Sequence, residues 1–157
     1  MRNCLRAERH VTLAPRSTTA LSDVDLWGAF FDTAYAYRFG PPSHDVTVAR
    51  LQSATGEPIA EAFHFPLGRA AIPAAAGLKV SLEQDDRGWV VRISASSFAQ
   101  SICIEDAAFV PEDNWFHLAP GYEKVVRMTP RKGVRRSEPG GTTGSLFGPV
   151  LTYGAPA

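Results

Sequence analysis

The sequence predicts a mainly β fold, an antiparallel β-sandwich, and three observations support this prediction. The chain has 12 prolines and 13 glycines in 157 residues, which implies many turns. Short strand-like segments follow one another closely between residues 46 and 128. Residues 113–121 combine a polar corner, a short half-buried strand and a tight Pro-Gly turn. Short strands at this spacing, with turn chemistry between them, fit a sandwich better than a βαβ fold.

The corner carries its own pattern of faces. Phe116 and Leu118 fall on one face of an extended segment, and Trp115 and His117 fall on the other, because side chains alternate along a strand. The Pro-Gly pair that follows fixes one φ angle and tolerates a positive one. It therefore predicts a type II turn over residues 119–122.

The clearest local prediction is a hairpin in the middle of the chain. Its strands cover residues 78–83 and 89–95, and the turn between them covers 85–88. Both strands alternate apolar and polar residues, and in the second strand the odd-numbered residues from Trp89 to Ala95 form the core face.

Two further strands follow this hairpin. One is expected at 101–105, with Ile102 and Ile104 pointing inward, and the other at 123–128. Residues 106–112 between them are expected to form a loop.

The first part of the chain predicts a less regular structure. Strands are expected at 11–14, 46–52 and 59–65, the last two as a hairpin. Residues 26–37 have aromatic and apolar residues at helical spacing, and Asp23 or Asp25 could cap such a helix. Gly28 and the aromatic content leave a strand open as the alternative.

Breaks rich in proline and glycine divide the chain into three predicted parts: 1–65, 66–130 and 131–157. The first is a partial second β-sandwich or an α+β segment, and the second is the main β-sandwich. The third is a mostly irregular Gly/Pro-rich tail, which leaves room for a closing edge strand at 150–153.

Composition narrows the class of protein. The 16 basic and 16 acidic residues balance, so neither nucleic acid nor a membrane surface is expected as a partner. No apolar run approaches the roughly 20 residues that span a bilayer, and the start lacks the apolar core of a secretory signal, so a cytoplasmic location is expected. Of the two cysteines, Cys4 and Cys103, the second is expected as a buried free thiol. No metal-ligand spacing or cofactor motif occurs, so no metal or cofactor is expected.

Candidate chemistry is sparse. The acid pairs at 85–86, 105–106 and 112–113 are interpreted as solvated turn residues, since neighbours on a turn cannot flank a glycosidic bond. His44 beside Asp45 is interpreted as structuring a loop, with an unrecognised catalytic site as the alternative.

Other side chains could serve in binding. Five basic residues form a local cluster: Arg127, Arg131, Lys132, Arg135 and Arg136. This cluster is interpreted as part of a solvated tail, because no aromatic platform accompanies it. Trp115, Trp89 and Tyr122 are the candidate carbohydrate or interdomain contacts, because aromatic side chains either stack on sugars or carry the burial of small sandwiches.

Several segments together resemble a known family. Residues 113–121 resemble the Asp-Asn-(aromatic)-Phe-x-Leu-x-Pro-Gly corner of the C-terminal immunoglobulin-like domain of β-mannosidases, multidomain enzymes of glycoside hydrolase family 2. Residues 91–104 resemble the same domain's strand, crossover and strand. Residues 32–45 and the hairpin after them resemble the end of the preceding immunoglobulin-like domain. The resemblance implies an immunoglobulin-like β-sandwich over 66–130.

The departures from the family limit what this resemblance implies. Its acid/base glutamate follows an asparagine on a (β/α)₈ barrel, but Asn3 precedes Cys4 and Asn114 precedes Trp115 here. Such a barrel needs about 250 residues, more than the 157 present. No catalytic residue is carried over, and the chain is expected to be a fragment without the catalytic barrel.

The function expected from this resemblance is that of a non-catalytic accessory portion of a β-mannosidase-like hydrolase, whose parent enzyme releases terminal β-mannosides from oligosaccharides. The alternative is a stand-alone carbohydrate-binding β-sandwich. The expected partners are a catalytic barrel on a parent or neighbouring polypeptide, a second copy in a homodimer, or an oligosaccharide. Exposed strand edges on an incomplete sandwich favour dimerisation or poor solubility.

Overall fold

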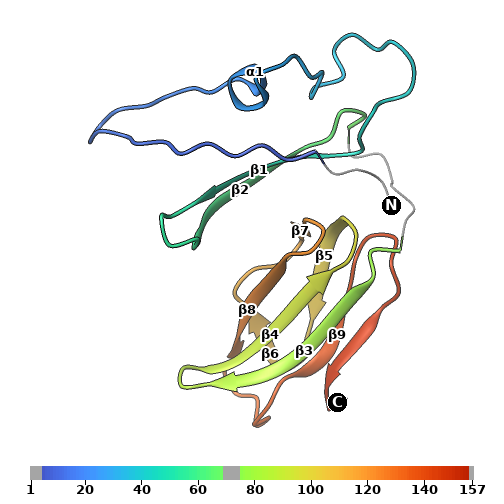
Figure 1. Ribbon diagram of the computed structural model, residues 1–157. Coiled ribbons are helices and arrows are strands. Elements are labelled where there is room, and N and C mark those ends of the chain that lie inside the picture. Colours follow the sequence, from blue (N-terminus) through green and yellow to red (C-terminus); the bar gives the residue numbers. More distant parts are fainter. Residues whose placement is uncertain (1–4, 69–74, 156–157) are drawn as a thin grey trace. The chain divides into compact units, whose positions relative to one another are not determined.

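The structure is a computed structural model, and it describes residues 5–68 and 75–155. The chain divides into two compact units, Met1–Arg69 and Ala70–Ala157. Cys4 and the first residues of the predicted polar N-terminus lie outside the described residues. The fold is nearly all β, with antiparallel pairing throughout, which confirms the predicted class (Figure 1).

The first unit contains one short helix and one hairpin. Helix α1 (Asp23–Trp27) begins at Ser22, whose side chain accepts a hydrogen bond from the Asp25 backbone in a capping box. It ends at Gly28, which adopts φ of 67°. The predicted helix over 26–37 was therefore wrong in extent, because the glycine stops it one turn in.

Strands β1 (Thr47–Gln52) and β2 (Pro58–His64) form the predicted hairpin, with Val48 opposite Phe63. The strand predicted at 11–14 was wrong: those residues are extended without pairing to a neighbouring strand. The carbonyl of Ala14 instead accepts hydrogen bonds from the N–H and the hydroxyl of Ser17, at 3.2 and 2.6 Å.

The first unit has no buried core among its described residues. None of residues 5–68 is buried, and Phe30, Phe39 and Ile59 are 65%, 90% and 62% exposed. A single hairpin is marginally stable in water, because two strands cannot cover an apolar face. The first unit therefore has apolar side chains available for contact with other surfaces.

The second unit is a sandwich of two four-stranded antiparallel sheets. One has the order β3-β4-β8-β6 and the other the order β10-β9-β5-β7 (Figure 1). The strands of the first sheet are β3 (Leu78–Asp85), β4 (Gly88–Ala95), β6 (Phe109–Pro111) and β8 (Glu123–Pro130). Those of the second are β5 (Ala99–Glu105), β7 (Phe116–Leu118), β9 (Gly140–Gly144) and β10 (Leu151–Gly154).

The core lies between the two sheets and follows the predicted alternation. Val91, Ile93 and Ile102 have no exposed surface, and Ile104 and Val126 are almost fully covered. Burial of these branched side chains is the main favourable term for the sandwich, because each removes apolar surface from water. The middle hairpin and the inward faces of Ile102 and Ile104 are confirmed.

The structure corrects the expected loop at 106–112 and the expected irregular tail. Residues 109–111 form β6, which pairs with β8. After Pro130 the chain returns to the sandwich, and Thr143 on β9 lies opposite Ile104 on β5. The edge strand expected at 150–153 corresponds to β10 at the edge of the second sheet.

Residues 140–144 form a strand because their backbone can approach that of β5 closely. A Cβ at Gly141 would lie 2.0 Å from the carbonyl oxygen of Glu105. Thr143 is 1% exposed, and its hydroxyl donates to the carbonyl of Cys103 at 2.8 Å. Glycines let β9 approach β5, and one buried threonine then holds the pairing in register.

Candidate functional site

The corner at residues 113–121 is built around the side chain of Asn114. Its Oδ1 accepts the backbone N–H of Ile104 at 2.8 Å, and its Nδ2 donates to the carbonyl of Ile104 at 2.9 Å. One amide side chain thus satisfies both backbone groups of a residue on β5 that is 2% exposed. The Asn114 side chain thus extends the hydrogen bonding between β5 and β7 to the residues before β7.

Trp115 lies between Asn114 and Phe116, the first residue of β7. Trp115 has φ of 61°, an uncommon conformation for a bulky residue, and its N–H donates to Asn114 Oδ1 at 3.0 Å. Its side chain is 64% exposed. The hydrogen bonds of the Asn114 side chain to Ile104, called the Asn114 clamp below, fix the backbone beside Trp115. The indole ring of Trp115 is therefore held toward solvent.

The rest of the corner anchors this exposed ring to the sandwich. Leu118 is 2% exposed and Phe116 packs against the core, which confirms the predicted inward face. Gly121 has φ of 77°, and the N–H of Tyr122 donates to the carbonyl of Ala119 at 3.2 Å, which confirms the predicted turn. Gly121 also donates its N–H to the Ala95 carbonyl at 2.9 Å.

A cation and a carboxylate cover the outer side of the corner. Lys124 forms an ion pair with Asp113, and its Nζ lies 4.4 Å from the centre of the Phe116 ring. Both charged side chains are substantially exposed, so the pair contributes little to stability. Asp113 also accepts the N–H of Asn114 at 2.8 Å, which orients the clamp.

His117 has a structural contact on the neighbouring strand. Its Nδ1 accepts the N–H of Ser101 at 2.9 Å. Ser101 has φ of 50°, and the pairing of β5 with β7 shifts register there, so the imidazole satisfies an N–H at a bulge. This contact indicates a structural role for His117.

The three aromatic contact candidates differ in their surroundings. Trp89 and Tyr122 are partly buried and pack against the core. Trp89 also donates its indole N–H to the Ser137 carbonyl at 3.1 Å. Trp115 is thus the one of the three whose ring is largely exposed.

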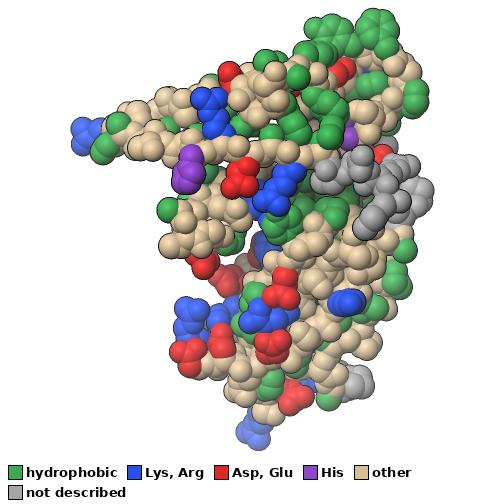
Figure 2. Space-filling view, viewed as in Figure 1, with side chains coloured by type: hydrophobic (Ala, Val, Ile, Leu, Met, Phe, Trp, Pro, Cys, Tyr) green, Lys and Arg blue, Asp and Glu red, His purple; other side chains and the backbone are tan. Residues whose placement is uncertain are grey.

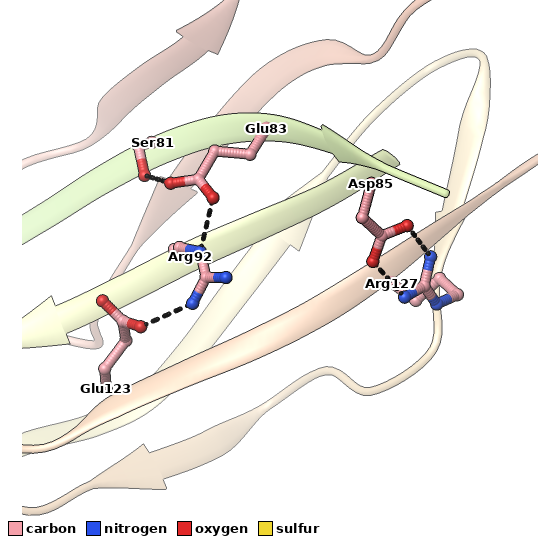
Figure 3. A network of polar contacts seen from close by, with 6 residues as sticks. All are labelled: Ser81, Glu83, Asp85, Arg92, Glu123 and Arg127. Atoms are coloured by element: carbon pink, nitrogen blue, oxygen red, sulfur yellow. Dashed lines mark hydrogen bonds and ion pairs between the residues drawn. The ribbon is translucent and has the colours of Figure 1, made fainter. Parts of the chain in front are cut away.

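The outer face of the β3-β4-β8-β6 sheet carries ion pairs rather than a catalytic arrangement (Figure 3). Arg92 on the central strand lies between Glu83 and Glu123, at 2.6 and 2.8 Å. Arg127 donates to both carboxylate oxygens of Asp85, at 3.0 and 2.7 Å. The Arg127 hydrogen bonds lower the pKa of Asp85 to about 2, so Asp85 is ionised at neutral pH.

Asp106 has a role that the sequence interpretation missed. Its Oδ1 accepts two N–H groups, from Ala108 and Phe109, at 2.8 and 2.9 Å. Its Oδ2 accepts the N–H of Gly140 at 2.8 Å and the hydroxyl of Tyr153 at 3.3 Å. Far from being a solvated turn acid, Asp106 joins the β5–β6 loop to β9 and β10.

Tyr153 and Cys103 are two further groups of the sandwich whose pKa values are shifted. Burial and the nearby Asp106 carboxylate raise the pKa of the Tyr153 phenol, which is 4% exposed. Burial raises the pKa of the Cys103 thiol, although the residue is half-buried rather than fully buried as expected. A raised pKa keeps that thiol protonated and unreactive.

His44 structures the loop that precedes β1. Its Nε2 lies 3.0 Å from both the Thr33 carbonyl and the Thr47 hydroxyl, and its Nδ1 lies 3.1 Å from the Ser43 hydroxyl. Both ring nitrogens are engaged by neighbouring loop groups. This arrangement favours the loop-structuring interpretation over a catalytic one.

Across residues 5–68 and 75–155, no group of three or more His, Cys, Asp or Glu side chains could hold a metal ion. No helix in the same part of the chain is long and apolar enough to cross a membrane.

Comparison with known proteins identifies the sandwich. Residues 74–143 match a family model described as an Ig-fold domain of mannosidase type. This match runs from the residues before β3 to β9 and includes the whole corner around Asn114. Residues 74–143 of the second unit are therefore similar to an immunoglobulin-like domain of the mannosidase type, and the two antiparallel sheets agree with that fold. Searches of curated proteins and of solved structures gave no match.

Proposed function

We propose that this chain is a non-catalytic accessory portion of a β-mannosidase-like glycoside hydrolase, whose parent activity is hydrolysis of terminal β-mannosides in oligosaccharides. The observation that carries the proposal is the match of residues 74–143 to the mannosidase-type Ig-fold domain. The charged and polar side chains described above form ion pairs and structural hydrogen bonds on the sandwich, and such contacts support a scaffold role rather than turnover.

The proposed role is to pack against a catalytic barrel carried by a parent or neighbouring polypeptide. The first unit supports this role, because Phe30, Phe39 and Ile59 are exposed by 60% or more of their surface, and none of residues 5–68 is buried. Phe30 and Phe39 both lie against the Tyr37 ring, at centroid distances of 5.4 and 6.4 Å, and contiguous exposed apolar surface is typical of interaction sites. Trp115, held out by the Asn114 clamp, would be a second point of contact, since exposed tryptophans are enriched among interface residues that dominate binding.

The test separates scaffold from enzyme. The purified 157-residue chain is assayed with an aryl β-mannoside, alone and mixed with a polypeptide that carries a mannosidase-type barrel. We expect no turnover from the chain alone, and a higher unfolding temperature for the mixture than for either component. Turnover by the chain alone would contradict the proposal, and so would an unfolding temperature that mixing leaves unchanged.

A stand-alone carbohydrate-binding module is the second candidate, and the exposure of the Trp115 ring favours it. Its test is calorimetric titration with manno-oligosaccharides of the native chain and of a Trp115→Ala variant. A matched control is Phe39→Ala, which removes an exposed ring from the first unit. This candidate predicts binding that Trp115→Ala abolishes and Phe39→Ala preserves. A flat titration up to millimolar sugar removes it.

A further inference from the structure

The four basic residues of the cluster that follow β8, Arg131, Lys132, Arg135 and Arg136, belong to a loop that is anchored to the sandwich and not to an irregular tail. The N–H of Arg131 donates to the Ala108 carbonyl at 2.8 Å, and the Trp89 indole donates to the Ser137 carbonyl at 3.1 Å. The N–H of Gly140 donates to Asp106 at 2.8 Å. Residues 131–139 are therefore fixed to the sandwich at their beginning, near their middle and at their end.

A hollow of about 340 Å³ lies where this loop meets strands β4 and β8. Its charged lining consists of three arginines, Arg87, Arg127 and Arg136, with no acidic residue among the lining side chains. Phe109 and Met128 also line it and are 2% and 3% exposed, so part of its wall is apolar. Apolar walls strengthen the interaction of an arginine with an anion, because they exclude some of the water.

The three guanidinium groups differ in how far their charge is already compensated. Arg127 is neutralised by Asp85, to which it donates two hydrogen bonds, at 3.0 and 2.7 Å. Within the described residues, Arg136 donates to the carbonyl of Ala155, which carries no net charge. In the described part of the chain, the Arg87 side chain has neither an ion pair nor a hydrogen bond, and only its backbone N–H contacts Asp85, at 2.9 Å.

Arg87 and Arg136 thus line one hollow without an ion pair among the described residues, although the charge of Arg87 also acts on Asp85. Figure 2 shows basic and acidic side chains gathered at the end of the sandwich where the β3–β4 turn lies. Asp85, Glu112 and Asp86 are the acids that act on Arg127. Arg87 lies at the turn and Arg136 on the anchored loop, so their positions come from two separately fixed elements.

We propose that this hollow binds an oxyanion, a carboxylate or phosphate group, through Arg87 and Arg136. Guanidinium groups suit such ligands because their N–H groups match the geometry of paired oxygens. The oxyanion comes either from a free small anion or from an acidic side chain on a partner polypeptide. The proposal is independent of the hydrolase role proposed above, because it rests only on residues of the sandwich.

The test uses the complete chain at low ionic strength, where exposed charges are least screened. Inorganic phosphate, glutarate and a hexaglutamate peptide are titrated separately. The indole N–H resonance of Trp89 reports on the hollow, because this group lines it and is bonded to Ser137. We expect a saturable shift in the millimolar range for at least one probe. The absence of a saturable shift with all three overturns the proposal.

Variants distinguish the site from general charge attraction. Arg87→Gln removes a side chain without a partner, so the fold is preserved, and it should weaken binding about tenfold. Arg92→Gln is the matched control, since Arg92 lies on the same sheet but outside the hollow and is paired with Glu83 and Glu123. Equal weakening by the two variants would contradict the proposal.

The same titrations separate the two sources of the oxyanion. A hexaglutamate affinity at least about tenfold above that of glutarate, lost in Arg87→Gln, assigns the site to an acidic partner segment. Equal affinities for phosphate, glutarate and peptide assign it to a free small anion.

Discussion

Replacing Asn114 by alanine tests the central structural feature of the corner. The change removes the acceptor of the Ile104 N–H, at 2.8 Å, and the donor to the Ile104 carbonyl, at 2.9 Å. Ile104 is 2% exposed, so water cannot easily replace the amide. A typical hydrogen bond contributes about 1 kcal/mol net, and a buried group left without a partner costs about 1–3 kcal/mol. The expected loss in free energy of unfolding is therefore about 2–4 kcal/mol.

Urea unfolding followed by circular dichroism measures this loss as a lower midpoint at unchanged slope. Hydrogen exchange of the Ile104 amide gives a local measurement, since this N–H should lose protection in Asn114→Ala. The matched control is Asp113→Asn, which keeps an acceptor for the Asn114 N–H but removes the charge from an exposed ion pair with Lys124. We expect the control to cost less than about 1 kcal/mol. The reasoning is refuted if both variants lose the same stability and Ile104 keeps its protection.

Three further predictions concern the core and the pH dependence of stability. Ile102→Ala should lower the free energy of unfolding by about 2–5 kcal/mol, because Ile102 is fully buried. Val125→Ala should change this free energy by no more than about 0.5 kcal/mol, since Val125 is 46% exposed. Similar losses for the two variants in chemical denaturation would contradict this prediction. Arg127 lowers the pKa of Asp85 from 3.8 to about 2, so the stability from this pair is present above pH 3.8 and is lost as pH falls toward 2. The difference in unfolding temperature between the native chain and Asp85→Asn should shrink over that range, and a constant difference would count against the pair. Burial raises the pKa of Tyr153 above its ordinary value of 10.0, so the unfolded state ionises first and the stability due to Tyr153 is complete below pH 10.0 and falls above it. Tyr153→Phe should reduce this alkaline loss of stability in thermal unfolding. An unchanged loss would exclude Tyr153 as its source.

The parts of the fold that the sequence predicted are those in which one short pattern has one physical solution. In β3, and in β4 apart from Val90, the alternation of apolar and polar residues determines both strand and face. The Pro-Gly turn was predictable because only glycine readily adopts the φ of 77° found at Gly121. Both predictions rest on local chemistry and needed no knowledge of distant partners.

The parts that could not be predicted depend on partners far along the chain. Strand β9 consists of glycines and threonines, and it becomes a strand only because it pairs with β5. Val90 points away from the core yet is only 3% exposed. It lies on a central strand opposite Arg127, and it lines a surface hollow together with Val110 and Val125. No local pattern carries such information.

The candidate site shows the same division. The exposed Trp115 and the structural His44 could be proposed from their loop contexts. The bonding of Asn114 to both backbone groups of Ile104 could not, because it depends on where β7 begins relative to β5. Asp106 looked like an ordinary turn acid, since its contacts with Gly140 and Tyr153 cross more than 30 residues of sequence.

The most direct test of the accessory role is the activity of the purified chain toward an aryl β-mannoside, measured alone and with a polypeptide that carries a mannosidase-type barrel. The account predicts no turnover by the chain alone and a raised unfolding temperature when the barrel polypeptide is added. Turnover that scales with the concentration of this chain alone would contradict it.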